Sequence, residues 1–100
     1  MLVEIHVPTS LREFAGGARK LRVEVSESAT VGGVFERLHL DYPGVVERAL
    51  DEQGRVRPHV NVFVDGENVR AGARLGLATP VKAGTEVWIL PAVSGGSGQS

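Results

Sequence analysis

Two segments near opposite ends of the chain alternate apolar and polar residues, and a single long helical stripe lies between them. Val3, Ile5 and Val7 alternate with polar residues or Leu in the stretch from Leu2, and Thr85–Leu90 alternates in the same way. A period of two places successive side chains on opposite faces, which predicts two half-buried strands. Such strands need an apolar cover, so this pattern favours a two-layer α+β fold.

The cover is predicted between residues 31 and 42. Apolar residues recur there at helical spacing, and Thr30 stands where a helix N-cap is preferred. Pro43 and Gly44 end the pattern, and the stretch Val45–Leu50 predicts a short second helix. The expected fold therefore has one main helix and one short helix.

Further strands are predicted from shorter patterns of the same kind. They lie at Leu21–Val25 and Val60–Val64, with a tight turn at Asp65-Gly66 and a short return strand at Glu67–Arg70. The sheet is thus expected to be mixed and to hold four or five strands. Pro8–Lys20 is long for a hairpin link, and Leu11 and Phe14 predict that part of it folds back onto the sheet.

Length and composition exclude several classes of function. One hundred residues predict one domain, here residues 1–91, followed by a tail of residues 92–100. The absence of cysteine removes disulfides, thiolate nucleophiles and iron–sulfur clusters. A net charge of −1 gives no support for a nucleic-acid surface, and no stretch is long enough for a membrane span. The opening residues lack the regions of a signal peptide, so a cytoplasmic location is expected.

The tail, LPAVSGGSGQS from Leu90, carries an adjacent glycine pair, Gly95 and Gly96. Glycine keeps a chain end slim and free in its backbone angles, as passage through a narrow channel of another protein would require. Composition alone does not decide whether such a tail is a discarded linker or the functional end of the molecule.

Nearly the whole chain resembles the bacterial ThiS, MoaD and CysO family of sulfur carriers, which have the β-grasp fold of ubiquitin. The resemblance lies in VEIHVPTSLREFAGG, in HVNVFVDGENVR and above all in LATPVKAGTEVWILPAVSGG, whose ILPAVSGG block is most similar to the carrier of cysteine synthesis. It implies that the first and last strands run parallel, side by side, at the centre of the sheet. It also implies that Gly96, preceded by Gly95, is the reacting residue. Its free carboxylate would attack the α-phosphate of ATP to give an acyl-adenylate, which a sulfur donor would convert to a thiocarboxylate. A protein without cysteine could then deliver sulfur from its own end.

The resemblance implies several partners and no cofactor held by this chain. An adenylating enzyme of the MoeB/ThiF type would use ATP and Mg²⁺, and a sulfurtransferase or sulfide would supply sulfur. The acceptor would be a synthase dependent on pyridoxal phosphate, and a metalloprotease would trim the carrier or release its product. The carrier itself is expected to be a monomer and not an enzyme.

The sequence departs from the family at its end, because Gly96 is followed by Ser97, Gly98, Gln99 and Ser100. As written, the carbonyl of Gly96 is an amide, which ATP cannot adenylate. Three explanations stay open: proteolytic trimming after Gly96, an artificial extension, or loss of the carrier function. Molybdopterin, thiosugar or thiamin synthesis, and a ubiquitin-like binding or modifier domain, remain alternatives to cysteine synthesis.

A partner-docking surface is predicted on the sheet face opposite the helix. Its candidate residues, with the start of the tail, are Phe63, Trp88, Leu90, Arg22, Pro91, Ala92, Val93 and Ser94. Aromatic anchors ringed by charge are typical of protein interfaces. The alternative is that Leu11 and Phe14 cover Phe63 and Trp88. His6, His39 and His59 lack metal-ligand spacing, so no metal site is predicted.

Overall fold

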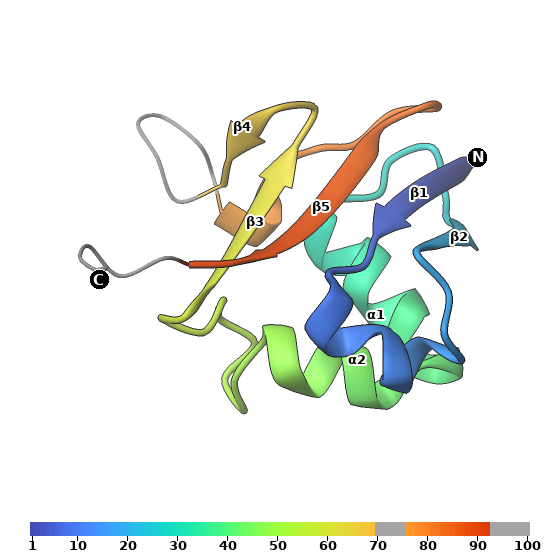
Figure 1. Ribbon diagram of the computed structural model, residues 1–100. Helices are drawn as coiled ribbons and strands as arrows, with labels where there is room; N and C mark the ends of the chain where they lie inside the picture. Colours follow the sequence, from blue (N-terminus) through green and yellow to red (C-terminus); the bar gives the residue numbers. More distant parts are fainter. Residues whose placement is uncertain (70–75, 93–100) are drawn as a thin grey trace.

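A single mixed sheet with helices on one side forms the part of the protein that the structure describes, residues 1–69 and 76–92 of a computed structural model (Figure 1). The elements in chain order are β1 (Leu2–His6), the 3₁₀ helix η1 (Thr9–Ala15), β2 (Lys20–Glu24), α1 (Val31–Asp41), α2 (Pro43–Ala49), β3 (Val60–Val64), β4 (Glu67–Asn68), the 3₁₀ helix η2 (Gly76–Ala78) and β5 (Glu86–Pro91). The predicted α+β class is confirmed.

The five strands lie in the order β2-β1-β5-β3-β4. β1 pairs antiparallel with β2 and parallel with β5, and β3 pairs antiparallel with both β5 and β4. The prediction that the first and last strands run parallel, side by side, is confirmed. β5, the strand from which the tail continues, has a hydrogen-bonded neighbour on each side.

Alternation sorts the strand side chains between the core and the surface. Val3, Ile5, Val23, Val62, Val87 and Ile89 are buried, as the period of two predicts. They pack with the stripe of α1, of which Val31, Val34, Phe35 and Leu38 are buried. Val25 was expected with them, but β2 ends one residue earlier and Val25 is only half-buried.

The two helices meet at Pro43, where the prediction needs one correction. α1 starts after Thr30, whose Oγ1 accepts a hydrogen bond from the backbone N of Gly33 at 3.2 Å, and it ends at Asp41. The second helix was expected to begin after the Pro-Gly pair, but α2 begins at Pro43 itself. Proline fits the first position of a helix because that backbone nitrogen needs no hydrogen-bond partner.

The segment between β1 and β2 forms η1, which the sequence did not predict as a helix. Phe14 of η1 packs against α2, where the Cζ atom of Arg48 lies 3.6 Å from the centre of its ring. Leu11 and Phe14 are both partly buried against the core. The expectation that this segment folds back onto the domain is met, with α2 as the main surface that Phe14 covers.

The β3–β4 hairpin closes through Asp65 and Gly66, as predicted. Their φ angles are 48° and 88°, so both central residues of the turn lie in the left-handed region, which is typical of a type I′ turn. β4 covers only Glu67–Asn68, and Arg70 of the longer predicted strand lies outside the described residues.

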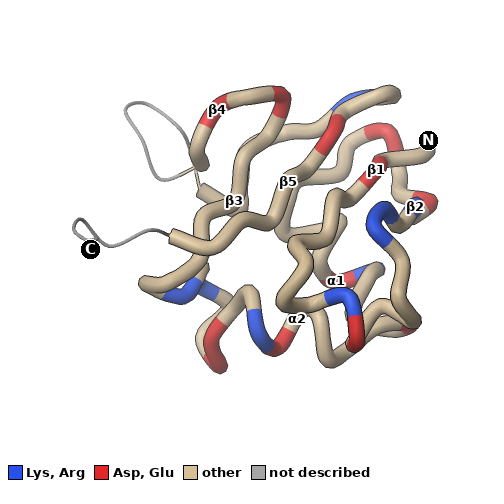
Figure 2. The backbone as a smooth tube through the Cα atoms, in the orientation of Figure 1, with Lys and Arg blue, Asp and Glu red and all other residues tan. Residues whose placement is uncertain are grey.

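Charged positions of both signs are distributed over the described backbone, although β1, β4 and β5 each carry an acidic position and no Lys or Arg (Figure 2). Within residues 1–69 and 76–92, no helix combines the length and the apolar character needed to cross a bilayer.

Candidate functional site

β5 delivers the chain to the tail from the middle of the sheet. Its last residue, Pro91, is in register with Val60 of β3, and the backbone N of Ala92 donates a hydrogen bond to the carbonyl of His59 at 2.9 Å. Pro91 is exposed and Ala92 is half-buried. The predicted residues Val93, Ser94, Gly95 and Gly96 lie outside the described residues.

The sheet face away from the helices carries an aromatic pair at its centre. Trp88 of β5 is 40% exposed, and its indole is stacked on the imidazole of His6 with ring centroids 3.6 Å apart and planes inclined by 1°. His6 is in register with Trp88 on one side, and Phe63 is in register with it on the other. The predicted residues Trp88 and Phe63 are therefore brought together, and His6 joins them.

Leu90 and Arg22 flank this aromatic row. Leu90 lies two residues beyond Trp88 on the same strand and is half-buried, in register with Asn61 of β3. Arg22 on β2 is exposed, and its Nε donates to Oε2 of Glu4 at 3.2 Å. Leu90 continues the apolar row and Arg22 lies on its charged side, as the predicted surface requires.

The charges around Glu4 lower the pKa of its carboxyl group. The side-chain hydrogen bond from Arg22 is the main cause, and the positive charge of Lys20 adds to it. Glu4 is thus a carboxylate at neutral pH. The face presents fixed charges of both signs around an aromatic centre, which suits a polar rim of an interface.

The alternative cover for the aromatic residues is not what the structure shows. Phe14 packs on Gly44 and Arg48 of α2 instead of on the exposed sheet face. Trp88 keeps its exposure, and its stacking partner is His6. The face opposite the helices therefore stays available to a partner.

A groove of about 670 Å³ lies beside this aromatic pair and was not predicted from the sequence. Trp88 and Pro91 line one side of it, and Arg12, Arg19 and Lys20 contribute positive charge. Arg12 is held by a hydrogen bond from its Nε to the carbonyl of Val7 at 3.1 Å. These cations lie far from β5 in sequence, and the parallel pairing of β1 with β5 brings the segment that carries them to the root of the tail.

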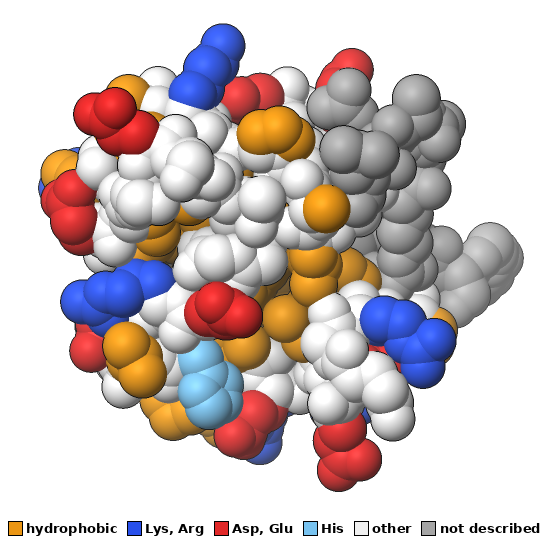
Figure 3. All heavy atoms as spheres, turned by 180° about the vertical axis from the view of Figure 1, so that it is seen from behind, with side chains coloured by type: hydrophobic (Ala, Val, Ile, Leu, Met, Phe, Trp, Pro, Cys, Tyr) orange, Lys and Arg blue, Asp and Glu red, His pale blue; other side chains and the backbone are white. Residues whose placement is uncertain are grey.

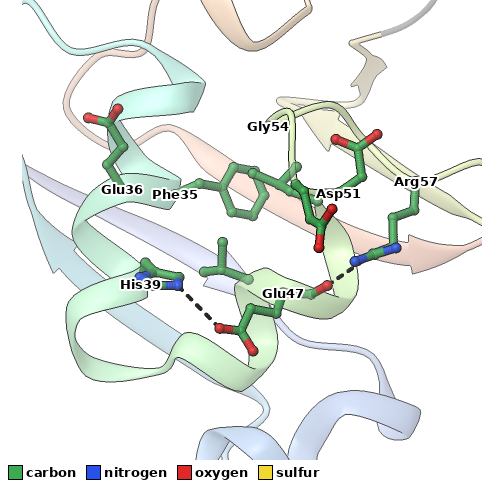
Figure 4. Close-up of a pocket in the computed structure, with 10 residues that line it drawn as sticks. Phe35, Glu36, His39, Glu47, Asp51, Gly54 and Arg57 are labelled. Carbon is green, nitrogen blue, oxygen red and sulfur yellow. Dashed lines mark hydrogen bonds and ion pairs between the residues drawn. The ribbon is translucent and has the colours of Figure 1, made fainter.

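A second cavity, of about 410 Å³, lies between the helices and the loop that follows α2 (Figure 4). Phe35 contributes an apolar wall, and Nε2 of His39 lies 3.6 Å from Oε2 of Glu47. Nε of Arg57 donates to the backbone carbonyl of Glu47 at 2.9 Å. The cavity shows no hydroxyl or thiol beside an activating base, so its arrangement gives no support for nucleophilic catalysis.

The loop beneath this cavity is organised by Asp51. Its Oδ1 accepts hydrogen bonds from the backbone N of Gln53 and of Arg55, each at 2.9 Å. The hydrogen bond from Arg55 is the main reason that the pKa of Asp51 lies below its ordinary value. The structure thus gives this residue a turn-forming role, which no sequence motif indicated.

The remaining surface formed by residues 1–69 and 76–92 carries no comparable aromatic centre. Viewed from the side opposite to Figure 1, charged side chains of both signs are spread over the molecule, with hydrophobic atoms visible between them (Figure 3). Leu40 of α1 is the most exposed large hydrophobic residue among those described, at 74%. It stands on the helix, away from β5, so it serves as a useful reference for the sheet face.

Comparison with known proteins gives consistent matches. Residues 5–96 match the model of the ThiS family. The sulfur carrier protein CysO of Mycobacterium tuberculosis is 38% identical over 98 residues, covering 96% of this chain and all of that protein. Small archaeal modifier protein 3 of Haloferax volcanii is 36% identical over 97 residues, with the same coverage. The Amycolatopsis orientalis BexX/CysO complex contains a chain that superposes with a TM-score of 0.79 at 33% identity, covering 94% of this chain and 99% of that one.

Proposed function

The chain belongs to the ThiS family of ubiquitin-like sulfur carriers, and we propose that it carries sulfur as a thiocarboxylate on Gly96 after removal of residues 97–100. The observation that carries this proposal is the extent of the family match. The match runs from residue 5 to residue 96, the second glycine of the pair. A carboxylate at that position is the group that the chemistry needs.

The proposed reaction has two steps. The carboxylate oxygen of Gly96 attacks the α-phosphorus of ATP, so that an acyl-adenylate forms and pyrophosphate leaves. Hydrosulfide then attacks the acyl carbon and expels AMP. With a sulfurtransferase persulfide as the donor, the attack gives an acyl disulfide, and two thiols that become a disulfide must reduce it to release the thiocarboxylate and the sulfurtransferase thiol. With hydrosulfide, the products are the thiocarboxylate, AMP and a proton, and no oxidant is required.

The chain supplies the reacting end and a surface, while its partners supply the catalytic groups. The ATP and Mg²⁺ belong to an adenylating enzyme of the MoeB/ThiF type. We propose that this enzyme docks on the exposed sheet face around Trp88, Phe63 and Leu90, with Arg22 at its rim. Pro91 and Ala92, followed by Val93, Ser94 and Gly95, would lead from this face into the active site of the enzyme.

The sulfur is proposed to serve cysteine biosynthesis in the cytoplasm. Similarity to CysO over nearly the whole chain supports this branch. The acceptor would be a pyridoxal-phosphate-dependent synthase, and a metalloprotease would release the product or trim the carrier. The structural neighbour in complex with BexX shows a CysO protein bound to another protein, and molybdopterin, thiosugar or thiamin synthesis stay as alternative destinations.

Protein modification is the second candidate function. It is favoured by the similarity to small archaeal modifier protein 3, which covers all of that relative. In this case the activated carboxyl group of Gly96 would be transferred to a lysine amine of another protein. Both functions need the same free carboxylate at Gly96. They differ in the nucleophile that attacks the activated carboxyl group, which is a sulfur donor in one case and a lysine amine in the other.

The test compares two forms of the protein that differ only in residues 97–100. The form that ends at Gly96 is incubated with an adenylating enzyme of the MoeB/ThiF type, ATP, Mg²⁺ and sulfide, and its intact mass is measured. We expect it to gain the mass difference between one sulfur and one oxygen, whereas the chain of residues 1–100 stays unchanged because its Gly96 is an amide.

The same experiment separates the outcomes. A form ending at Gly96 that stays at its original mass, with an enzyme that is active on another carrier, contradicts the proposal. A mass corresponding to linkage with lysine-containing proteins in cell extract, instead of sulfur loading, favours the modifier function. Analysis of the protein recovered from its own cells then shows whether residues 97–100 are removed.

A further inference from the structure

Three potential metal ligands come together on the exposed sheet face, where β1 and β5 pair. Glu4 and His6 are two residues apart on β1, so both side chains project from this face. Glu86 of β5 is in register with Glu4, and Figure 2 shows acidic positions of these two strands side by side. One ligand atom from each of the three residues lies within 4.8 Å of the other two, and no other such group occurs among residues 1–69 and 76–92.

The imidazole of His6 is already oriented toward the two carboxylates. Stacking on Trp88 fixes the plane of the ring, and the His6 side chain is only 15% exposed. Its Nε2 atom is buried and has no hydrogen-bond partner, although Oε1 of Glu86 lies 3.2 Å away. A buried ring nitrogen without a well-aligned partner is unfavourable, and a cation between it and Glu86 would satisfy both groups.

The surroundings permit a cation to enter and leave. The Glu86 side chain is 50% exposed and that of Glu4 is 29% exposed, so the group opens to solvent on the side of β5. Arg22 bonds Oε2 of Glu4, and Lys20 on β2 is in register with His6. These two cations offset part of the negative charge, so the site is expected to bind reversibly instead of permanently.

We propose that Glu4, His6 and Glu86 bind a divalent cation of the zinc class. One imidazole nitrogen and two carboxylate oxygens form a donor set that Zn²⁺ accepts, whereas Mg²⁺ and Ca²⁺ favour oxygen donors alone. Three protein ligands leave a further coordination position for water. The inference rests on the described sheet and is independent of the sulfur chemistry proposed above.

The linear spacing of the histidines could not predict this group. His6 has no second histidine near it in sequence, and Glu86 lies 80 positions further along the chain. Only the parallel pairing of the first and last strands joins them. The expectation of no metal ligand, drawn from sequence spacing, is therefore replaced by this proposal.

Zinc titration of the tag-free protein tests the proposal. Trp88 is the only tryptophan of the chain and is stacked on His6, so its fluorescence reports directly on the site. We expect a saturable change with one equivalent of Zn²⁺, confirmed by calorimetry, and no change with Mg²⁺ at the same concentrations. NMR shifts should be largest for the amides of β1 and β5.

Variants distinguish this site from other zinc-binding groups. Glu86→Gln keeps the stack and should weaken Zn²⁺ binding at least about tenfold, and His6→Gln should weaken it as much or more. The matched control is His39→Gln, which removes a histidine that also faces a carboxylate, Glu47, but belongs to no group of three. The proposal is wrong if Zn²⁺ gives no saturable change, if Glu86→Gln binds like the wild type, or if His39→Gln abolishes binding.

Discussion

The imidazole of His6 lies parallel to the indole of Trp88, with the ring centroids 3.6 Å apart. This contact joins neighbouring strands on the exposed face of the sheet, because the two residues are in register across the parallel pair β1 and β5. The indole is thereby held in one orientation before any partner arrives. A side chain that is already ordered loses less entropy on binding, which makes Trp88 a suitable anchor.

Replacing Trp88 with alanine should weaken the complex with the adenylating enzyme. A central aromatic anchor typically contributes about 2 kcal/mol or more, so the dissociation constant should rise roughly 30-fold. Surface plasmon resonance with the form that ends at Gly96 gives the measurement. Leu40→Ala is the control, since Leu40 is more exposed than Trp88 but lies on α1. Equal affinities for the wild type and Trp88→Ala would remove the support for this docking surface.

Reversing the charge of Arg22 should also reduce affinity, mainly through slower association. The Arg22 side chain is 65% exposed at the edge of the face, and charges at the rim of an interface act chiefly on the association rate. Arg22→Glu is therefore expected to lower the rate constant several-fold at low salt and less at high salt. Arg37→Glu, on α1 and paired with Asp41, provides a matched charge reversal. An unchanged affinity for Arg22→Glu would argue that the partner binds elsewhere.

The side chain of Phe35 is 1% exposed and connects the stripe of α1 to the sheet. Phe35→Ala should reduce the free energy of unfolding by about 3–5 kcal/mol, because it removes buried surface and leaves a cavity. Urea denaturation followed by circular dichroism measures this change. Leu40→Ala on the same helix should change stability by less than about 0.5 kcal/mol. Similar losses in both variants would contradict the assignment of the effect to core packing of Phe35, and helix propensity could not explain them because alanine is the best helix former.

Asp51 should stabilise the loop after α2 at neutral pH and lose this effect in acid. Its pKa is lower in the folded protein than in the unfolded chain, since the carboxylate accepts a hydrogen bond from the backbone N of Arg55. This contribution is complete above the unfolded value of about 4 and is lost as the pH falls through the folded value. Asp51→Ala should therefore lower the melting temperature at neutral pH, and this difference should shrink at an acid pH below the folded pKa of Asp51.

The neighbouring residue provides the control for this experiment. Glu52 is exposed, and Glu52→Ala should leave the melting temperature nearly unchanged at both pH values. A difference between wild type and Asp51→Ala that persisted in acid would mean that the turn depends on something other than the ionised carboxylate.

The sequence predicted the strands, the main helix and its cap because those features depend on local periodicity. Val3 and Ile5 alternate with polar residues, and the stripe beginning at Val31 follows the helical repeat, so burial could be read from position. The segment Thr9–Ala15 has no such repeat. It forms η1 because Phe14 can pack against α2, and that contact exists only in the folded chain.

The sequence predicted which residues lie on the candidate surface but not which of them contact one another. Alternation placed His6 and Trp88 on the same face, yet their stacking depends on the register of β1 with β5. Likewise, no local pattern joins Arg12 and Lys20 to Pro91 in one groove. Long-range pairing decides these neighbours, and the sequence signals of a strand do not specify its register with a distant strand.

β5 lies between β1 and β3. In the sequence it is followed by Ala92, Val93 and Ser94 and then by the glycine pair. A pulling force on the carboxyl end is therefore resisted by the hydrogen bonds that β5 makes with the strands on both of its sides. In the parallel ladder with β1 these bonds lie across the direction of pull, so they must shear together instead of opening one at a time. In the reaction proposed above, the end of the chain would be drawn into another protein and withdrawn again while the domain that bears it resists forced unfolding.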